Sequence, residues 1–352
     1  MTQRTWAAVL AVPLLLVLGM YSAIKPLPYV TYAPGLTINV LGDYDGHPVI
    51  DVQGHPVYPD SGQLRMTTVS VTDRNSHLDL LTLMRTWFSR DDGIYPYAIQ
   101  YPSTGSAQQD AEEGQVEMIS SQDDAIAAAM RQLGYTFTQN LQIVLVQPNM
   151  PAQGKLQVHD VLRRVGTTRV TAKTDIPKLI AAVPDGQSIP FTVERQGKQV
   201  TVRVTPTTVQ GHRLVGIRLG VGYDFPFKVS VNINSDIGGP SAGLMFALSI
   251  YDTLTPGSLT SGGTIAGTGE ITGHGKVGAI GGIQQKIVGA RHDGAQLFLV
   301  PAPNCDDAVT SQHGSMRLAR VATLKQAIAV VTAWGKNHDV ALPQCTASKA
   351  AS

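Results

Sequence analysis

The feature that most restricts the fold of this chain is a stretch of twenty residues, 5–24, without a charged side chain. Arg4 and Lys25 flank the stretch, and leucine, valine and alanine dominate it. At about 1.5 Å of rise per residue, a helix of this length spans roughly 30 Å, the thickness of the apolar core of a bilayer. We therefore predict a single-pass transmembrane anchor over 5–24, which places the protein in the cell membrane.

A cleaved signal peptide is the alternative interpretation, and it requires small residues at positions −3 and −1 of the cleavage site. Met20 and Tyr21 occupy position −3 for cleavage after Ser22 and Ala23, respectively. Neither side chain is small, so the sequence favours a retained anchor. Both interpretations export the remaining chain, so we expect an extracytoplasmic protein.

The overall charge argues against nucleic acid as a partner. Lysine and arginine total 27 and aspartate and glutamate total 26, which leaves a formal net charge of +1. This balance provides no electrostatic attraction for a phosphate backbone. We therefore expect no nucleic-acid partner.

The chain has two cysteines, too few for a disulfide framework or for a zinc site of four cysteines, and we expect no metal. In an exported chain Cys305 and Cys345 can form a disulfide, which closes a loop of about 40 residues. Two unpaired thiols are the alternative.

A length of 352 residues suffices for two or three domains. Strand-like and helical patterns both occur after the N-terminal stretch, so we predict an α+β fold. Four segments follow the anchor: a mixed α/β region over 26–135, a β-rich domain over 136–206, an α/β domain over 210–335 and a C-terminal tail over 336–352. Within the first segment, the patterns predict a helix over 78–88, a polar loop over 103–117 and a second helix over 121–133.

Residues 151–162 read Pro-Ala-Gln-Gly-Lys-Leu-Gln-Val-His-Asp-Val-Leu. This stretch resembles PDZ domains of the bacterial protease type, which have such a turn and strand after their first β-hairpin. The resemblance implies a domain that binds an extended peptide at a sheet edge beside a helix. We place the carboxylate-binding loop at 134–137, where a clear glycine-rich pattern is missing. A small β-rich spacer domain is the alternative.

Ser241 follows a strand-like run, 228–234, and stands where an apolar helix is predicted to begin. Free N–H groups and the positive end of the helix dipole meet at such a position, so an oxyanion would find donors beside a nucleophilic hydroxyl. Gly238 and Gly239 allow a substrate backbone to approach, and with Ala242 they are our candidates for the oxyanion and substrate-approach positions. A simple helix N-cap is the other interpretation of Ser241.

The Gly-x-Ser-x-Gly pattern around Ser241 is also typical of the nucleophile turn of α/β-hydrolases. An acidic residue and a histidine would then have to follow, and the candidates are Asp306, Asp307, His313 and His338. The preceding sequence lacks the run of βαβ units that such a fold needs. The sequence therefore favours a different base for Ser241 over an α/β-hydrolase site.

Lys286 provides a different base. On a helix, Ile283, Lys286, Ile287 and Ala290 lie on one stripe, and Lys286 is its only charge. A lysine in an apolar face loses hydration, which favours the neutral amine and makes it a plausible general base. A lysine that reaches from the edge of the face into water is the alternative.

Three motifs follow in order: Gly-Pro-Ser-Ala-Gly at 239–243, Thr-Gly-Glu-Ile-Thr at 268–272, and the glycine-rich stretch that ends at Lys286. Together they resemble the proteolytic domain of Lon-type serine proteases over about residues 210–335. The resemblance implies Ser241 as nucleophile, Lys286 as general base and Thr268 as the hydroxyl that orients the lysine. It also implies a homo-oligomer, a ring of six.

The chain departs from this family at one position. Many Lon enzymes have aspartate directly before the Gly-Pro-Ser motif, where this chain has Gly238, and Asp236 lies two residues earlier. The sequence leaves open whether Asp236 takes over any role of that aspartate in ordering the site.

Lon enzymes usually carry an ATPase, but no Gly-x-x-x-x-Gly-Lys-Ser/Thr motif occurs here. The whole chain therefore resembles bacterial membrane-anchored PDZ-Lon proteases, and neither ATP nor another cofactor is implied. We predict a membrane-tethered, ATP-independent serine endopeptidase that cleaves extracytoplasmic proteins or peptides. The alternative is a membrane scaffold that binds peptides through its PDZ domain and has an inert protease domain.

Overall fold

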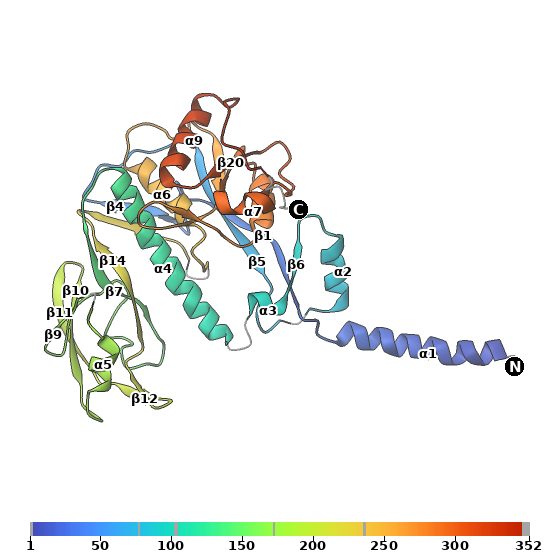
Figure 1. Ribbon diagram of the computed structural model, residues 1–352, viewed down its shortest axis with the longest axis horizontal. Coiled ribbons are helices and arrows are strands. Elements are labelled where there is room, and N and C mark those ends of the chain that lie inside the picture. The colour runs from blue at the N-terminus through green and yellow to red at the C-terminus, as the bar shows by residue number, and fades with distance from the viewer. Residues whose placement is uncertain (1–2, 77, 102–104, 172, 235–236, 347–352) are drawn as a thin grey trace, which may run out of the picture.

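The computed structural model describes residues 3–76, 78–101, 105–171, 173–234 and 237–346. The fold is α+β, as predicted, with two six-stranded sheets that belong to two separate bodies. Figure 1 shows one long helix, α4, running between these bodies, and a further helix, α1, projecting at the N-terminal end.

The first sheet combines strands from both ends of the chain. Its spatial order is β20 (Arg317–Val321), β19 (Leu297–Pro301), β16 (Thr264–Gly267), β5 (Gln63–Val71), β1 (Tyr29–Asn39) and β6 (Gly93–Pro96). The two halves meet where β5 pairs with β16 in parallel, with Leu64 opposite Ile265. The predicted segments 26–135 and 210–335 therefore build one sheet together.

The second sheet lies between these two parts in sequence. Its order is β11 (Lys198–Val204), β10 (Ile189–Arg195), β8 (Val161–Val165), β7 (Thr138–Val146) and β14 (Ile217–Asp224), and β9 (Thr168–Arg169) pairs with β8. Strand β14 pairs with β7 from Ile217 opposite Val146 to Asp224 opposite Thr138. The sheet therefore extends beyond the predicted range of 136–206. Helix α5 (Ile176–Ala181) contributes Ile176 and Ile180 to the core of this body.

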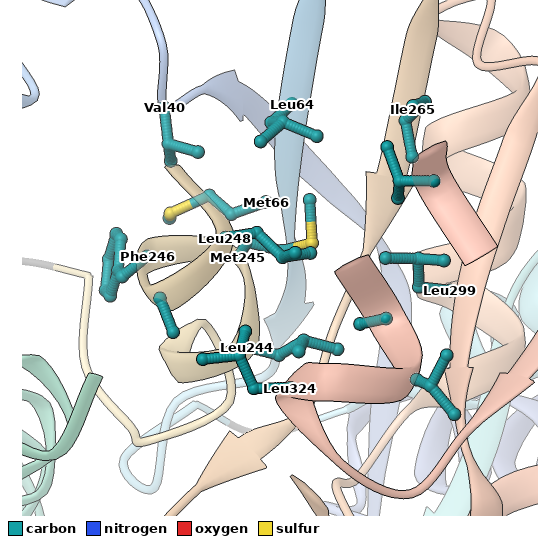
Figure 2. Close-up of a cluster of buried hydrophobic side chains, with 14 of the residues drawn as sticks. Val40, Leu64, Met66, Leu244, Met245, Phe246, Leu248, Ile265, Leu299 and Leu324 are labelled. Atoms are coloured by element: carbon teal, nitrogen blue, oxygen red, sulfur yellow. The ribbon is translucent and has the colours of Figure 1, made fainter. Parts of the chain in front are cut away.

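Helix α6 (Gly243–Thr253) fills the centre of the first body, as Figure 2 shows. Its side chains are apolar on almost every side, and Leu244, Met245, Phe246 and Leu248 are completely buried. A helix without a polar face is stable only when it is surrounded by protein. Leu64 and Met66 of β5 pack against it, so α6 fixes the residues just before it relative to the sheet.

Helix α4 (Ala107–Gln132) is twice as long as the helix predicted over 121–133, and it replaces most of the loop predicted over 103–117. Its start is fixed by a capping box, in which the Ser106 hydroxyl accepts from the Gln109 N–H and the Gln109 side chain accepts from the Ser106 N–H. Polar residues such as glutamine and glutamate are good helix formers. A polar stretch made of such residues can therefore form an exposed helix, and the prediction of a loop over 103–117 was wrong.

The remaining elements are short or peripheral. They are β2 (Asp43–Tyr44), β3 (His47–Pro48), β4 (Ile50–Gln53), α2 (Leu80–Phe88), α3 (Tyr97–Gln100), β12 (Thr207–Val209), β13 (His212–Leu214), β15 (Lys228–Val231), β17 (Glu270–Ile271), β18 (Val277–Gly278), α7 (Ile283–His292), the 3₁₀ helix η1 (Ala302–Asn304), α8 (Cys305–Ala308) and α9 (Leu324–Lys336).

Helix α1 (Gln3–Ile24) covers the stretch for which a transmembrane anchor was predicted. In the part of the chain that the structure describes, none of the helices combines the length and the apolar character needed to cross a membrane. The structure therefore does not support the transmembrane prediction for 5–24.

The predicted tail packs on the first body as far as residue 346. A disulfide joins Cys345 to Cys305, and the Arg320 N–H donates to the Pro343 carbonyl at 2.8 Å. One guanidinium N–H of Arg317 donates to the Val340 carbonyl at 2.6 Å. These contacts attach the end of the described chain to β20.

The buried carboxyl group of Asp252, a residue of α6, provides a test of the packing around this helix. Asp252 is only 1% exposed, and burial together with the nearby Asp60 carboxylate raises the pKa of Asp252 to about 7. An unfolded aspartate ionises near pH 3.9, so between about pH 4 and 7 the unfolded state loses this proton first and stability falls as pH rises. We expect Asp252→Asn, which is neutral at every pH, to raise the free energy of unfolding by about 2 kcal/mol at pH 8.

Urea unfolding of both proteins at pH 4 and pH 8 measures this difference. The gain should be confined to the higher pH, because at pH 4 the wild-type carboxyl is protonated as well. Equal stability of the two proteins at pH 8 would contradict a protonated Asp252 in the folded state.

Candidate active site

Ser241 lies in a turn directly before α6. Helix α6 begins at Gly243, and its N-cap is Ala242, which makes no side-chain cap bond. Ser241 is therefore not the N-cap of α6, and its hydroxyl is available for another partner.

That partner is Lys286 of α7. The Lys286 Nζ lies 2.6 Å from the Ser241 Oγ and 3.1 Å from the Thr268 Oγ1. The Thr268 hydroxyl in turn donates to the Ser241 carbonyl at 3.0 Å, and the Gly269 N–H donates to the same carbonyl at 2.8 Å. Ser241, Thr268 and Lys286 thus form one hydrogen-bonded cluster, although Ser241 and Lys286 are 45 residues apart in the sequence.

Lys286 is held in an apolar environment. Ile283, Lys286, Ile287 and Ala290 are all buried, and Lys286 itself is 2% exposed. Burial lowers the pKa of Lys286 to about 7, because the ammonium form loses its hydration while the neutral amine loses little. The alternative interpretation, in which Lys286 reaches from the edge of the apolar face into water, is therefore wrong.

Helix α7 can start where it does because its N-cap is Gly282. This residue has φ +67°, and a Cβ added there would lie 2.7 Å from a methyl group of Val69 on β5. Only glycine combines this left-handed backbone with such a close approach to the sheet. The first turn of α7 is thereby fixed against β5, and Lys286 follows in the next turn.

Thr268 follows β16 and is completely buried. Its single hydroxyl both accepts from Lys286 and donates to the Ser241 backbone. This double role uses the two capacities of a threonine hydroxyl and fixes the lysine amine relative to the serine.

The segment before Ser241 lies against α4. Gly239 has φ +91°, and its N–H donates to the Gly114 carbonyl of α4 at 3.2 Å. A Cβ on Gly238 would come within 3.4 Å of the Gly114 backbone, so glycine permits this close approach. In this conformation the Gly239 N–H is engaged, whereas the Ala242 N–H has no hydrogen-bond partner among the described residues. Asp236 lies outside the described residues.

A cleft of about 410 Å³ lies beside Pro240, the residue before Ser241. Pro240, Ser120 and Ser121 contribute to its wall, together with Glu270 and Lys276 from the region of the β17–β18 hairpin. Pro240 directly precedes Ser241 in the chain, and Ser241 itself is not among the residues that line the cleft.

The residues that an α/β-hydrolase site would need are engaged elsewhere. The His313 Nδ1 lies 2.9 Å from the Met316 carbonyl, and the His338 ring stacks on Trp334 with the ring centroids 4.1 Å apart. No contact among the described residues joins either histidine to Ser241. In the segment 134–137, for which a carboxylate-binding loop was predicted, Tyr135 and Phe137 pack into an apolar cluster with Val229 and Ile250.

We expect Thr268→Val to lower turnover about tenfold, because valine keeps the volume and loses both hydrogen bonds of the hydroxyl. The buried Ser241 carbonyl keeps the Gly269 N–H as a donor, so the fold should survive. Steady-state hydrolysis of a peptide, with thermal unfolding measured in parallel, checks this. Unchanged turnover in a folded variant would show that Lys286 needs no orienting group.

A serine hydroxyl, a buried lysine amine beside it and a threonine hydroxyl bonded to both residues are the groups that a serine hydrolase with a lysine base requires. Comparison with known protein families agrees with this class. Residues 234–332 match the Lon protease (S16) C-terminal proteolytic domain, and residues 131–205 match the PDZ domain. The predicted presence of a Lon-type proteolytic domain and of a PDZ domain is confirmed, and the spacer interpretation of the second body was wrong.

Among curated relatives, Lon protease of Xanthomonas oryzae pv. oryzae is 37% identical over 95 residues, which cover 26% of this chain and 11% of the relative. Lon protease 1 of Sorangium cellulosum is 37% identical over 119 residues, 32% of this chain and 14% of the relative. The chain thus matches only about a seventh or less of these relatives' length. The PDZ domain of an SdrC-like protein from Listeria innocua aligns with 23% of this chain and 92% of its own, at 16% identity and a TM-score of 0.21.

Proposed function

We propose that this protein is a serine endopeptidase, with Ser241 as nucleophile, Lys286 as general base and Thr268 as the group that orients the lysine. The observation that supports it most is the 2.6 Å separation between the Ser241 hydroxyl and a lysine that is 2% exposed. A charged surface lysine could not act as a base near neutral pH, whereas one with a pKa of about 7 can.

The chemistry follows from these positions. The neutral Lys286 amine takes the proton of Ser241 as its oxygen attacks the scissile carbonyl carbon. The resulting oxyanion lies near the start of α6, where the helix dipole favours negative charge and where the Ala242 N–H, which has no hydrogen-bond partner among the described residues, can donate. Lys286 then returns the proton to the leaving amine, and the acyl group remains on Ser241. Water attacks the ester in the same way and releases the second product.

The test is hydrolysis of an unfolded protein such as casein by the wild type and by Ser241→Ala. We expect turnover in the wild type and none in the variant. A fluorophosphonate probe adds a direct readout, because labelling should be confined to Ser241. A folded wild type that cleaves nothing would instead favour the inert peptide-binding scaffold.

We further propose that the PDZ domain binds peptide at β14. This strand ends the order β11-β10-β8-β7-β14, so its outer edge has no strand partner in the described chain and can accept an extended peptide. Gly216, with φ +82°, lies in the turn that leads into β14. Just before this turn, Arg213 of β13 forms an ion pair with Asp185, which follows α5 in the chain.

Removal of the inserted body tests the presenting role. Because β14 completes its sheet, the deletion must run to residue 224 rather than to 206. We expect the deletion to weaken cleavage of casein more than cleavage of a short peptide, since the domain supplies remote binding and no chemistry. Equal losses on both substrates would argue against peptide presentation.

The setting of the enzyme is also a proposal. The Cys305–Cys345 disulfide supports a location outside the cytoplasm, since such bonds persist in oxidising compartments. The exposed apolar side chains of α1, among them Leu14, Leu15 and Leu16, support attachment to a membrane. Independence of ATP and assembly into a ring of six rest on the sequence resemblance. Cell fractionation with and without residues 1–25, and light scattering of the purified protein, test location and assembly.

A further inference from the structure

Helix α4 contacts the segment that carries the nucleophile through a side chain. Ser121 is 4% exposed, and its hydroxyl donates to the Pro240 carbonyl at 2.8 Å. Pro240 directly precedes Ser241, so this bond fixes the peptide unit that leads into the nucleophile. Seven residues earlier on the same helix, the Gly114 carbonyl accepts from the Gly239 N–H and so holds the peptide unit between Gly238 and Gly239.

The same helix contacts the PDZ sheet. The Tyr223 hydroxyl of β14 donates to an Asp124 carboxylate oxygen at 2.7 Å, and the buried Gln142 amide of β7 donates to Asp123. Tyr223 lies on β14, the strand at whose outer edge we propose that peptide binds. The guanidinium of Arg131 lies 4.6 Å from the ring centroid of Phe137 and strengthens this side of the contact.

Ser121 and Asp124 are three residues apart, so they lie within one turn of α4 and move together with it. One rigid turn thus holds the nucleophile segment with one side chain and the PDZ sheet with another. A shift of β14 relative to the first body would pull on Asp124 and hence displace Ser121.

We propose that Ser121 is a positioning residue for Ser241, and that the Tyr223–Asp124 bond makes the PDZ sheet part of the same positioning device. This inference rests on the proposed peptidase function. It assigns α4 the task of relaying the position of β14 to the nucleophile, beyond peptide presentation alone.

Two variants break the link at its two ends. Ser121→Ala removes the bond to Pro240, and we expect kcat to fall about tenfold with KM unchanged, because misplacement of a reacting group slows chemistry rather than binding. Tyr223→Phe removes only a hydroxyl of the PDZ sheet, and we expect a decrease of about threefold in kcat. The pH midpoint set by Lys286 should stay near 7 in both variants. The double variant should be no slower than Ser121→Ala alone, since both changes break one link.

The chain offers matched controls. Ser249 is a buried serine whose hydroxyl donates to the Val40 carbonyl at 2.8 Å, the same bond type as that of Ser121 but away from the nucleophile segment. Thr201 makes a hydrogen bond to Thr192 between β10 and β11, within the PDZ sheet and away from α4. Ser249→Ala and Thr201→Val should leave kcat within twofold of the wild type. A decrease in these controls as large as in the test variants would show general destabilisation and overturn the proposal.

Hydrogen–deuterium exchange of the peptide that covers 237–248 provides a readout independent of hydrolysis. Ser121→Ala and Tyr223→Phe should both increase exchange there, and the two controls should not. Increased exchange in a chain that cleaves nothing would retain the link and refute the peptidase function. An active wild type whose exchange and kcat are unaffected by Tyr223→Phe would refute the link and retain the peptidase. If Ser121→Ala fails to fold, Tyr223→Phe alone decides, because it removes a single half-buried oxygen.

Discussion

Lys286→Gln is expected to abolish peptide hydrolysis, and the wild type is expected to show a single basic limb with a midpoint near pH 7. The base must be neutral to take the Ser241 proton, and burial lowers the pKa of Lys286 to about 7. Since the neutral fraction rises from about a tenth at pH 6 to about nine-tenths at pH 8, kcat/KM should increase about tenfold over this interval. Lys286→Arg should fail as well, because guanidinium does not deprotonate in this range.

Stability separates loss of the base from loss of the fold. Between about pH 7 and 10.5 the unfolded state binds a proton at Lys286 that the folded state lacks, so this residue destabilises the fold at neutral pH and less so as pH rises. Lys286→Gln should therefore unfold at the same temperature as the wild type or a higher one at pH 7. Lys325 is exposed, so Lys325→Gln serves as the control for loss of a lysine charge and should keep full activity. A Lys286→Gln protein with the wild-type rate and pH profile would refute a lysine base.

Removal of the disulfide by the double substitution Cys305→Ala and Cys345→Ala is expected to lower the free energy of unfolding by about 4 kcal/mol. The bridge spans 40 residues of sequence, and a loop of that size loses about this much chain entropy in the unfolded state. Urea unfolding of the oxidised wild type and the double variant measures the difference, and the reduced wild type should match the variant. The hydrogen bonds that hold Lys286 go to Ser241 and Thr268 and not to either cysteine, so the folded variant should retain its turnover. A loss below about 1 kcal/mol would contradict a structural role of the bridge.

The chemistry-bearing part of the site could be predicted from sequence because its determinants are local. The stripe of Ile283, Lys286, Ile287 and Ala290 depends only on helical spacing, and it correctly predicted a lysine in an apolar environment. Ser241 was found from the strand, glycines and apolar helix around it. The oriented cluster itself, with the Thr268 hydroxyl between the other two residues, came from the resemblance rather than from spacing.

Features that depend on partners far along the chain were missed. Ser121 contacts Pro240 across 119 residues, and nothing in its own helix indicates that partner. Strand β14 was left outside the PDZ range because its hydrogen bonds go to β7, which precedes it by about 75 residues. The Ser106–Gln109 capping box is a local sequence pattern that marks the start of α4, but its polar residues also occur in loops.

The position of the PDZ body in the chain has a consequence for biosynthesis. Strand β5 pairs with β16 some 200 residues later, so the first sheet cannot close until the ribosome has made the segment beyond β16. The inserted body, by contrast, has all its strands once residue 224 has emerged, and it can fold early. A growing chain therefore has a folded PDZ body while Ser241 and Lys286 are still apart. Proteolytic activity would therefore arise only after the segment that contains β16 and Lys286 has been made.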